Sequence, residues 1–265
     1  MILHYFKIAF RNLCKHKTQN IISIIGLAVG LLCFCVCIYC SRFVESTDHC
    51  FANHDRIAEL NLYDGKADRY FSGSPVPLAE ELRTWALGET EAISSVTYPR
   101  ERPYYVELSP EKTLPYELET IEIDTCYNKI FTPEMVAGHW KMASQSLNSV
   151  ILSQSMAIKI FGNAESAIGK HMTLMRRLNT SPESTPKTGG IVYTIQAVMK
   201  DIPLNNSLDF MQNIDMLTVN DSEGLLQSPK RHNMTGANTY VLLSPQTTCT
   251  DLEKQFSKRD YTYTL

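Results

Sequence analysis

The side chains best suited to bind a metal are concentrated between residues 33 and 54 of this sequence. His49 and His54 lie at the end of this region, and four cysteines precede them in an uncharged apolar run: Cys33, Cys35, Cys37 and Cys40. Each residue of a helix turns by about 100°, so we expect these cysteines to spread around a helix and to act as small hydrophobic side chains. We interpret the two histidines as surface residues, because the other candidate ligands are scattered: His139, His171 and His232.

No combination of residues in the sequence predicts a catalytic site. The chain lacks the phosphate-binding pattern GxxxxGK[ST], the dinucleotide-binding pattern GxGxxG, the hydrolase pattern GxSxG and the zinc-protease pattern HExxH. The acid pair Glu80 and Glu81 is expected on the exposed face of a helix, where carboxylates are solvated. We therefore predict no enzyme activity, no catalytic residue, no cofactor and no metal site.

One apolar run is long enough to cross a membrane. Residues Asn20 to Cys40 are 21 residues without a formal charge, which at about 1.5 Å per residue match a hydrocarbon core of about 30 Å. Backbone groups in lipid must be satisfied within the segment, so the run must be helical. It is longer than the apolar region of a signal peptide and lacks a cleavage site of small residues, so we expect a permanent anchor.

The charged residues before this run predict the orientation of the anchor. Four cations and no acid precede residue 20, as is typical of a cytoplasmic flank: Lys7, Arg11, Lys15 and Lys17. Their spacing favours an amphipathic helix from Tyr5 to Lys17 at the cytoplasmic headgroups, and the alternative is a short solvated basic tail. Without these four, 21 of the 25 cations remain against 28 acids, a net charge of −7 that argues against nucleic acid as a partner.

The sequence divides into a cytoplasmic basic segment (1–19), a transmembrane helix (20–41) and an extracytoplasmic domain (42–265). Apolar periodicity after the anchor predicts a mixture of strands and short helices, hence an α+β domain. Three outer cysteines, Cys50, Cys126 and Cys249, allow at most one disulfide. The polar stretch Arg176 to Gly190 predicts a long hairpin loop. Predicted strands are 56–63, 93–98, 104–108, 119–125, 148–154, 170–175, 191–200 and 239–244, and predicted helices are 77–87, 155–161 and 246–258.

Five stretches of the sequence are distinctive in their order and spacing: Tyr5 to Leu13 (YFKIAFRNL) with Ile22 to Leu31, Asn53 to Ile57 (NHDRI), Asn148 to Lys170 with its FG and IGK turns, Tyr193 to Ser207 (YTIQAVMKDIPLNNS) and Thr239 to Leu243 (TYVLL). Together they resemble MacB/FtsX-type ABC transporter permeases. Each motif is weak by itself, but five in register cover nearly the whole chain. The resemblance implies a first transmembrane helix followed by a MacB-like periplasmic core domain.

The resemblance also implies a cellular location and partners. It places the chain in the cell inner membrane, with a cytoplasmic N-terminus and a periplasmic domain. Its partners would be membrane lipid, a separate ABC ATPase, the remaining permease helices and envelope proteins. Because three further helices of such permeases are missing here, we expect either a truncated or split permease subunit for ATP-driven export or mechanotransmission, or a stand-alone anchored binding or adaptor module.

Overall fold

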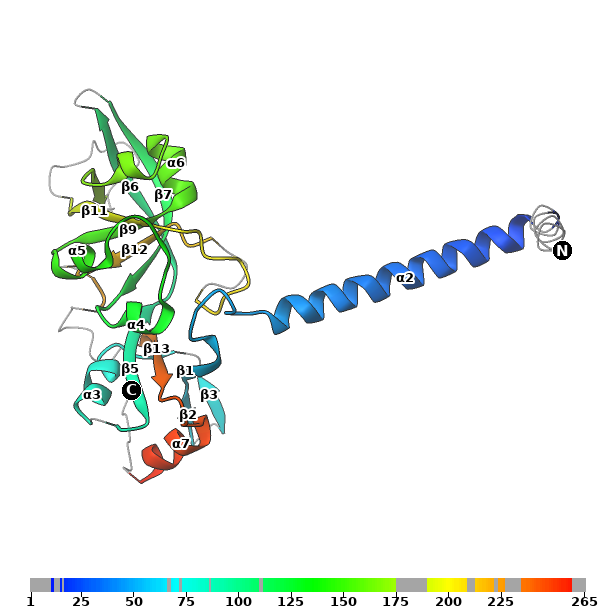
Figure 1. The fold of residues 1–265 in the computed structure, drawn as a ribbon, viewed down its shortest axis with the longest axis horizontal. Helices are drawn as coiled ribbons and strands as arrows, with labels where there is room; N and C mark the ends of the chain where they lie inside the picture. The colour runs from blue at the N-terminus through cyan, green and yellow to red at the C-terminus, as the bar shows by residue number, and fades with distance from the viewer. Residues whose placement is uncertain are drawn as a thin grey trace. The chain divides into compact units, whose positions relative to one another are not determined.

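The computed structural model describes residues 11, 15, 17–65, 68–71, 73–85, 87–109, 112–174, 190–208, 213–221, 224–226 and 235–258. The chain forms two compact units, Met1–Thr47 and Asp48–Leu265, which are described here one at a time (Figure 1). The predicted amphipathic helix at 5–17 and the predicted loop at 176–190 lie almost wholly outside the described residues.

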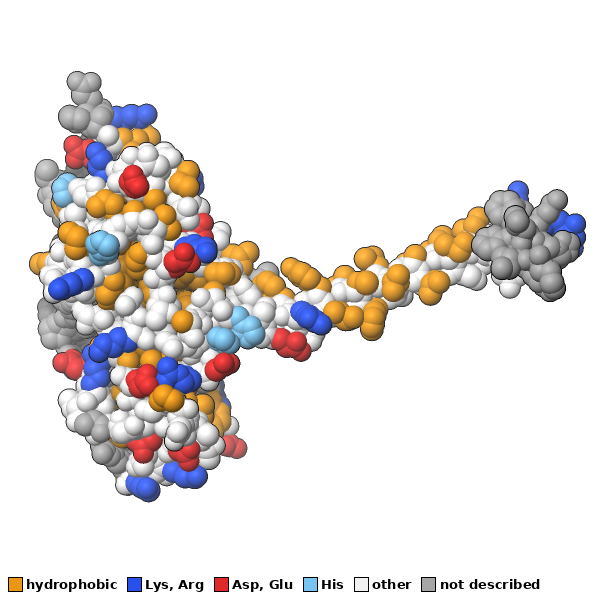
Figure 2. All heavy atoms as spheres, viewed as in Figure 1, with side chains coloured by type: hydrophobic (Ala, Val, Ile, Leu, Met, Phe, Trp, Pro, Cys, Tyr) orange, Lys and Arg blue, Asp and Glu red, His pale blue; other side chains and the backbone are white. Residues whose placement is uncertain are grey.

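The first unit contains one long helix, α2 (Lys17–Glu45), which exceeds the predicted span at both ends. None of its residues is buried and its apolar side chains are exposed, as Figure 2 shows for one face, which suits a helix surrounded by lipid. Among the described helices, it alone has the length and apolar composition to cross a membrane. Its cysteines do not all spread around the helix as expected, because spacings of four and three residues put Cys33, Cys37 and Cys40 on one face.

Six strands of the second unit close into a barrel. The spatial order around the barrel is β6, β7, β12, β9, β11, β10 and back to β6, and each strand is hydrogen-bonded to the next in this order. Closure leaves no free edge in this part of the sheet. Alternate side chains of these strands form one buried cluster together with helix α6 (Gln154–Phe161). The bounds are β6 Arg100–Ser109, β7 Lys112–Ile123, β9 Ser149–Ser153, β10 His171–Leu174, β11 Val192–Met199 and β12 Met216–Val219.

A second group of strands extends the sheet beyond the barrel in the order β1, β13, β5, and β5 joins β7 through the pair Val96 and Ile123. Helices α3 (Leu78–Thr84) and α7 (Cys249–Ser257) share one cluster with one face of these strands. Helix α4 (Tyr127–Phe131) belongs to the cluster on the other face. The strands are β1 Ile57–Leu60, β5 Thr90–Thr97 and β13 Thr235–Leu243, with β4 Ser74–Pro75 paired to β13.

A large hydrophobic cluster unites the barrel with the outer strands. It contains Ile151 and Leu217 from the barrel, Val96 and Tyr240 from the outer strands, and Phe131 from α4. A cluster shared in this way agrees with the division of the chain, in which residues Asp48–Leu265 form one compact unit.

The structure confirms the α+β class and corrects several local predictions. The strand predicted at 56–63 is interrupted at Asn61, giving β1 and a separate hairpin of β2 (Leu62–Asp64) and β3 (Arg69–Phe71). Strand β7 begins at Lys112 rather than 119, because its first half pairs with β6 and has too little apolar alternation to be recognised. Sequence patterns also missed α4, β12, β8 (Met135–Gly138) and α5 (Trp140–Gln145), which are short.

Candidate functional site

The candidate site is built around residues 48–56, which follow the membrane helix in the sequence and are called the connector segment here. Its first residue, Asp48, makes two hydrogen bonds to one turn of the domain. The Asp48 amide donates to the Asn205 carbonyl at 3.0 Å, and its Oδ1 accepts from the Ser207 amide at 2.8 Å. Asp48 adopts a left-handed backbone, φ 64°, which aspartate tolerates better than most residues. The chain is thus held at its entry into the domain.

Phe51 is inserted into the large central cluster and is 4% exposed. Its ring lies edge-on to that of Phe131 in α4, with centroids 5.0 Å apart. Burial of an aromatic side chain of this size contributes about 1.5–3 kcal/mol, and the edge-to-face pair adds roughly 0.5–1.5 kcal/mol. The connector segment is therefore attached to the core as well as to the surface.

The NHDRI motif supplies the remaining attachments of the connector segment. The Asn53 side-chain amide donates to the backbone carbonyls of Lys129 (3.3 Å) and Ile130 (3.5 Å) in α4. The Arg56 guanidinium donates to the Leu243 carbonyl at the end of β13 (2.9 Å) and to Asn53 Oδ1 (3.1 Å). It also pairs with a carboxylate of β5, Glu91, at 3.0 Å. These residues therefore join three elements of the domain by hydrogen bonds rather than perform chemistry.

The DIPLNNS motif, residues 201–207, forms the turn that receives Asp48. Asn206 is fully buried and stabilises this turn by two side-chain bonds, to the Pro203 carbonyl (2.6 Å) and from the Leu208 amide (3.0 Å). Asp201 accepts from the Ser155 amide (2.9 Å) in the first turn of α6, where a carboxylate is favourable. The turn therefore links the connector segment to the helix that belongs to the barrel core.

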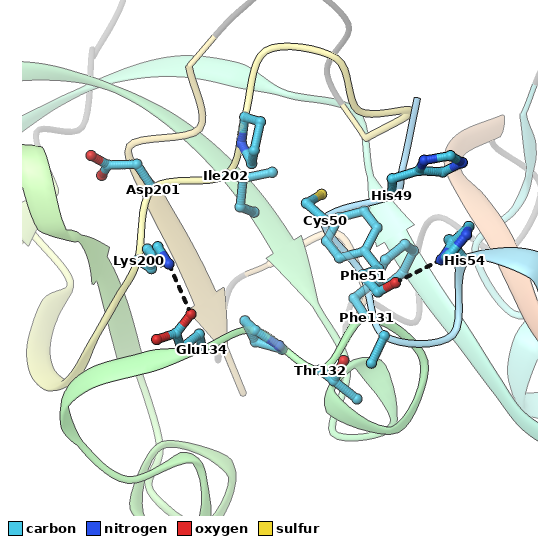
Figure 3. A pocket seen from close by; sticks show the side chains of 13 residues that line it. His49, Cys50, Phe51, His54, Phe131, Thr132, Glu134, Lys200, Asp201 and Ile202 are labelled. Atoms are coloured by element: carbon cyan, nitrogen blue, oxygen red, sulfur yellow. Dashed lines mark hydrogen bonds and ion pairs between the residues drawn. The ribbon is translucent and has the colours of Figure 1, made fainter. Parts of the chain in front are cut away.

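A pocket of about 500 Å³ lies between three of these segments (Figure 3). Residues of the connector segment form one wall, the α4–β8 loop forms another, and the end of β11 forms the third. Glu134 and Lys200 form an ion pair at 3.1 Å on one side of the pocket, opposite the two histidines (Figure 3). The lining residues are His49, Cys50, Phe51, Ala52, His54, Phe131, Thr132, Pro133, Glu134, Lys200, Asp201, Ile202 and Pro203.

The thiol of Cys50, which lines the pocket, is not activated by its surroundings. Burial, reinforced by the negative charge of Asp48, raises the pKa of Cys50 to about 11, so the thiol stays protonated near neutral pH. Thr132 has φ 42°, an uncommon conformation for a β-branched residue, and it ends α4 at the pocket edge. The pocket thus has aromatic walls and mostly paired charges, without an activated nucleophile.

Ser153 and His171 each have a local partner and do not form a catalytic arrangement with one another. Ser153 caps α6, its oxygen accepting from the Met156 amide at 3.4 Å. His171 lies on β10 beside the Thr194 hydroxyl, at 3.2 Å. Within the described ranges no group of three or more His, Cys, Asp or Glu side chains has the arrangement of a metal site, and the cysteines described there form no disulfide. Glu80 and Glu81 are exposed on α3, as predicted.

A buried ionic cluster in the barrel was missed by sequence reasoning. Arg102 of β6 pairs with Glu122 of β7 at 2.7 Å and lies 3.9 Å from Asp221, and the Tyr193 hydroxyl donates to Asp221 at 2.9 Å. Glu122 also accepts from the Leu225 amide. Burial is the main cause that raises the pKa of the Tyr193 hydroxyl, and the negative charge of Asp221 is the second. These groups satisfy one another's charges and hydrogen bonds, and they connect β6, β7 and β11 with the segment after β12. The sequence alone does not indicate them, because they come together only when the strands pair.

Comparison with known proteins agrees with this description. The family model of the MacB-like periplasmic core domain matches residues 21–259. A domain of a protein named as a permease from Porphyromonas gingivalis has a similar fold, with a TM-score of 0.57 and 23% identity over 80% of this chain and 87% of that one. The periplasmic region of MacB from Actinobacillus actinomycetemcomitans is also similar, with a TM-score of 0.50 and 12% identity over 82% of this chain and 86% of that one.

A third solved structure, the extracellular domain of the noncanonic ABC-type transporter YknZ from Gram-positive bacteria, gives a TM-score of 0.46 and 12% identity, over 75% of this chain and 87% of that one. No curated protein matches the sequence. At such identities the first two structural similarities show the fold alone, whereas the family model matches most of the chain, a range that contains the connector segment and its turn. The chain belongs to the family of MacB-like periplasmic core domains found in ABC transporter permeases.

Proposed function

We propose that this protein is a non-catalytic, membrane-anchored subunit of an ABC-type transporter, in which a separate ATPase moves the anchor helix and the periplasmic domain follows. The observation that carries the proposal is the connector segment, which is attached to the domain at several places. Asp48 is bonded to the 201–207 turn, Phe51 is buried in the core, and Arg56 is bonded to the end of β13. A segment attached at three places transfers displacement to the whole domain.

The chain between the helix and these attachments is short. Helix α2 ends at Glu45, and the amides of Ser46 and Thr47 donate to the carbonyls of Arg42 (3.0 Å) and Val44 (3.1 Å). The next residue, Asp48, already bonds to the domain. Only two residues therefore separate the helix from the first attachment, and a linker absorbs movement in proportion to its length. This short link supports transmission of movement rather than simple tethering.

The proposal includes the location and topology of the chain. Residues 1–19 would be cytoplasmic, residues 20–41 would span the cell inner membrane, and residues 42–265 would be periplasmic. The cations before residue 20 support this orientation, because positive flanks are retained in the cytoplasm. ATP would come from the separate ATPase, because the sequence has no phosphate-binding loop. Neither catalytic residues nor a cofactor are proposed for this chain.

The proposal is tested by purifying the full chain from membranes of its own host in a mild detergent. We expect an ABC ATPase and other permease helices to co-purify with it, and the matched control replaces residues 17–45 with an unrelated transmembrane helix. The control should lose the ATPase, because the membrane helices carry that contact. The purified chain alone should hydrolyse neither ATP nor peptides nor esters.

Two outcomes would overturn the proposal. Absence of any ATPase from the intact complex, with other envelope proteins bound equally by the chain and the control, would favour the stand-alone adaptor. Turnover by the purified chain that one substitution abolishes, for example Ser153→Ala or His171→Gln, would show an enzyme.

A further inference from the structure

The pocket beside the connector segment has the size of a small-molecule site and a fixed apolar floor. Its volume of about 500 Å³ falls within the roughly 300–1,000 Å³ that is typical of ligand pockets. Phe51, Phe131 and Ile202 line it and are at most 9% exposed, so the hydrophobic core holds these side chains in place. An apolar group that enters the pocket therefore meets a surface that is already formed.

The ion pair of Glu134 and Lys200, on one side of the pocket, is positioned by the backbone. The Lys200 amide donates to the Glu134 carbonyl at 2.8 Å, and the two side chains pair at 3.1 Å (Figure 3). These side chains are 72% and 63% exposed, and an ion pair so open to water contributes little to stability. The fold does not depend on this pair, so a ligand can separate the two charges at small cost.

Two opposite charges side by side match a ligand that carries both an ammonium and an acidic group. Glu134 can accept hydrogen bonds from an ammonium, and Lys200 can donate to a carboxylate or phosphate. The other acid that lines the pocket, Asp201, already accepts from the Ser155 amide at 2.9 Å. Because the pair is neutral overall, a ligand with one charge alone would leave one of the two side chains without a partner. The pocket therefore favours a zwitterion.

The backbone at the edge of the pocket supports a role in binding. Thr132 ends α4 with φ 42°, a conformation that costs a β-branched residue free energy. Such residues are often found at ligand sites, where the surrounding structure enforces them. Thr132 lies two residues before Glu134, so this turn directs the chain from α4 to the carboxylate of the ion pair.

We propose that the pocket binds a small zwitterion with an apolar body, the chemistry shared by a short apolar peptide with free ends and a zwitterionic phospholipid headgroup with its adjoining acyl carbons. The ammonium pairs with Glu134, the carboxylate or phosphate pairs with Lys200, and the apolar part covers the floor. Residues of the connector segment form one wall, so a bound ligand holds this segment against the α4–β8 loop. Only this last consequence rests on the proposed function of the connector segment.

The test measures how far ligands protect Cys50, which lines the pocket, from alkylation at pH 8.5. The full chain is kept in a nonionic detergent, and Cys249 on α7 serves as the internal reference. The probes are a leucine–phenylalanine dipeptide with free ends, the same dipeptide blocked at both ends, and the dihexanoyl forms of phosphatidylethanolamine and phosphatidylglycerol. At about twice its Kd, a zwitterionic probe should slow the reaction of Cys50 about threefold. Protection by the free dipeptide alone identifies a peptide as the ligand, and protection by phosphatidylethanolamine alone identifies a lipid headgroup.

Variants of the ion pair test the assignment of the two charges. Glu134→Gln and Lys200→Met should each weaken binding about tenfold, the effect of losing a hydrogen bond to a charged group. The matched control is Lys254→Met, which breaks another exposed ion pair, with Asp251 on α7, and should leave binding unchanged.

Failure of every probe to protect Cys50 would overturn the proposal. Equal protection by the blocked dipeptide or by phosphatidylglycerol would do the same, as would unchanged affinity in both pocket variants. These failures are separable from failure of the proposed function, because co-purification of an ATPase does not depend on a ligand in this pocket. A chain that binds a zwitterion but no ATPase would keep the binding site and lose the transporter assignment.

Discussion

Replacement of Phe51 by alanine should detach the connector segment from the core and destabilise the second unit. The side chain is 4% exposed and its ring is 5.0 Å from that of Phe131. Truncation of a buried phenylalanine costs about 3–5 kcal/mol, which includes lost burial and the cavity that remains. With a urea dependence of about 2–3 kcal/mol per molar for a domain of this size, the unfolding midpoint should fall by roughly 1.5 M.

Tryptophan fluorescence of the full chain in micelles measures this change directly, because both tryptophans, Trp85 and Trp140, lie in the second unit. The matched control is Tyr70→Ala, which removes an aromatic ring that is 74% exposed and should change the midpoint by less than a quarter as much. A Phe51→Ala midpoint within about 0.3 M of the wild type would refute the reasoning, since it would correspond to a loss under about 1 kcal/mol.

Further substitutions and labelling test other parts of the structure. Arg56→Lys keeps the charge but loses the forked hydrogen bonds, and should cost about 1–2 kcal/mol in urea unfolding; no change would show that these bonds are unimportant. Gly138→Ala should destabilise the domain, because its Cβ would lie 2.3 Å from a backbone oxygen of β11 at φ 71°, whereas Gly88→Ala, which has open space, should be neutral; equal melting temperatures would contradict this. With its raised pKa, Cys50 should react with iodoacetamide at pH 7.5 about tenfold more slowly than Cys249, although both side chains are exposed; equal rates would contradict the raised pKa of Cys50.

Local sequence patterns predicted the parts of the fold whose residues are close in the chain. The strand and helix at 148–161 were recognised within one residue, because Ser153 caps α6 and Gly162 takes the left-handed conformation that ends it. The strands at 170–175 and 191–200 pair antiparallel as β10 and β11. The long apolar helix was recognised because its length and apolar composition are visible in the sequence itself.

The candidate site was less predictable, because its parts are far apart in the sequence. NHDRI and DIPLNNS were recognised only as family motifs, and nothing in their spacing indicated that Asp48 would meet Ser207, 159 residues later. Likewise, the partner of Glu122 could not be identified before β6 and β7 were known to pair.

By itself, the sequence determined that the chain has one apolar helix of membrane length, that the rest is an α+β domain, and that no known catalytic motif is present. Such features depend on composition and on periodicities of two or 3.6 residues, which are properties of short stretches of the sequence. Only the tertiary structure decided that six strands close into a barrel. It also decided that residues 48–56 are attached to three separate parts of the domain, namely the 201–207 turn, α4 and the end of β13. Those outcomes depend on which distant strands pair and which side chains fill a shared core, and a local pattern does not specify either.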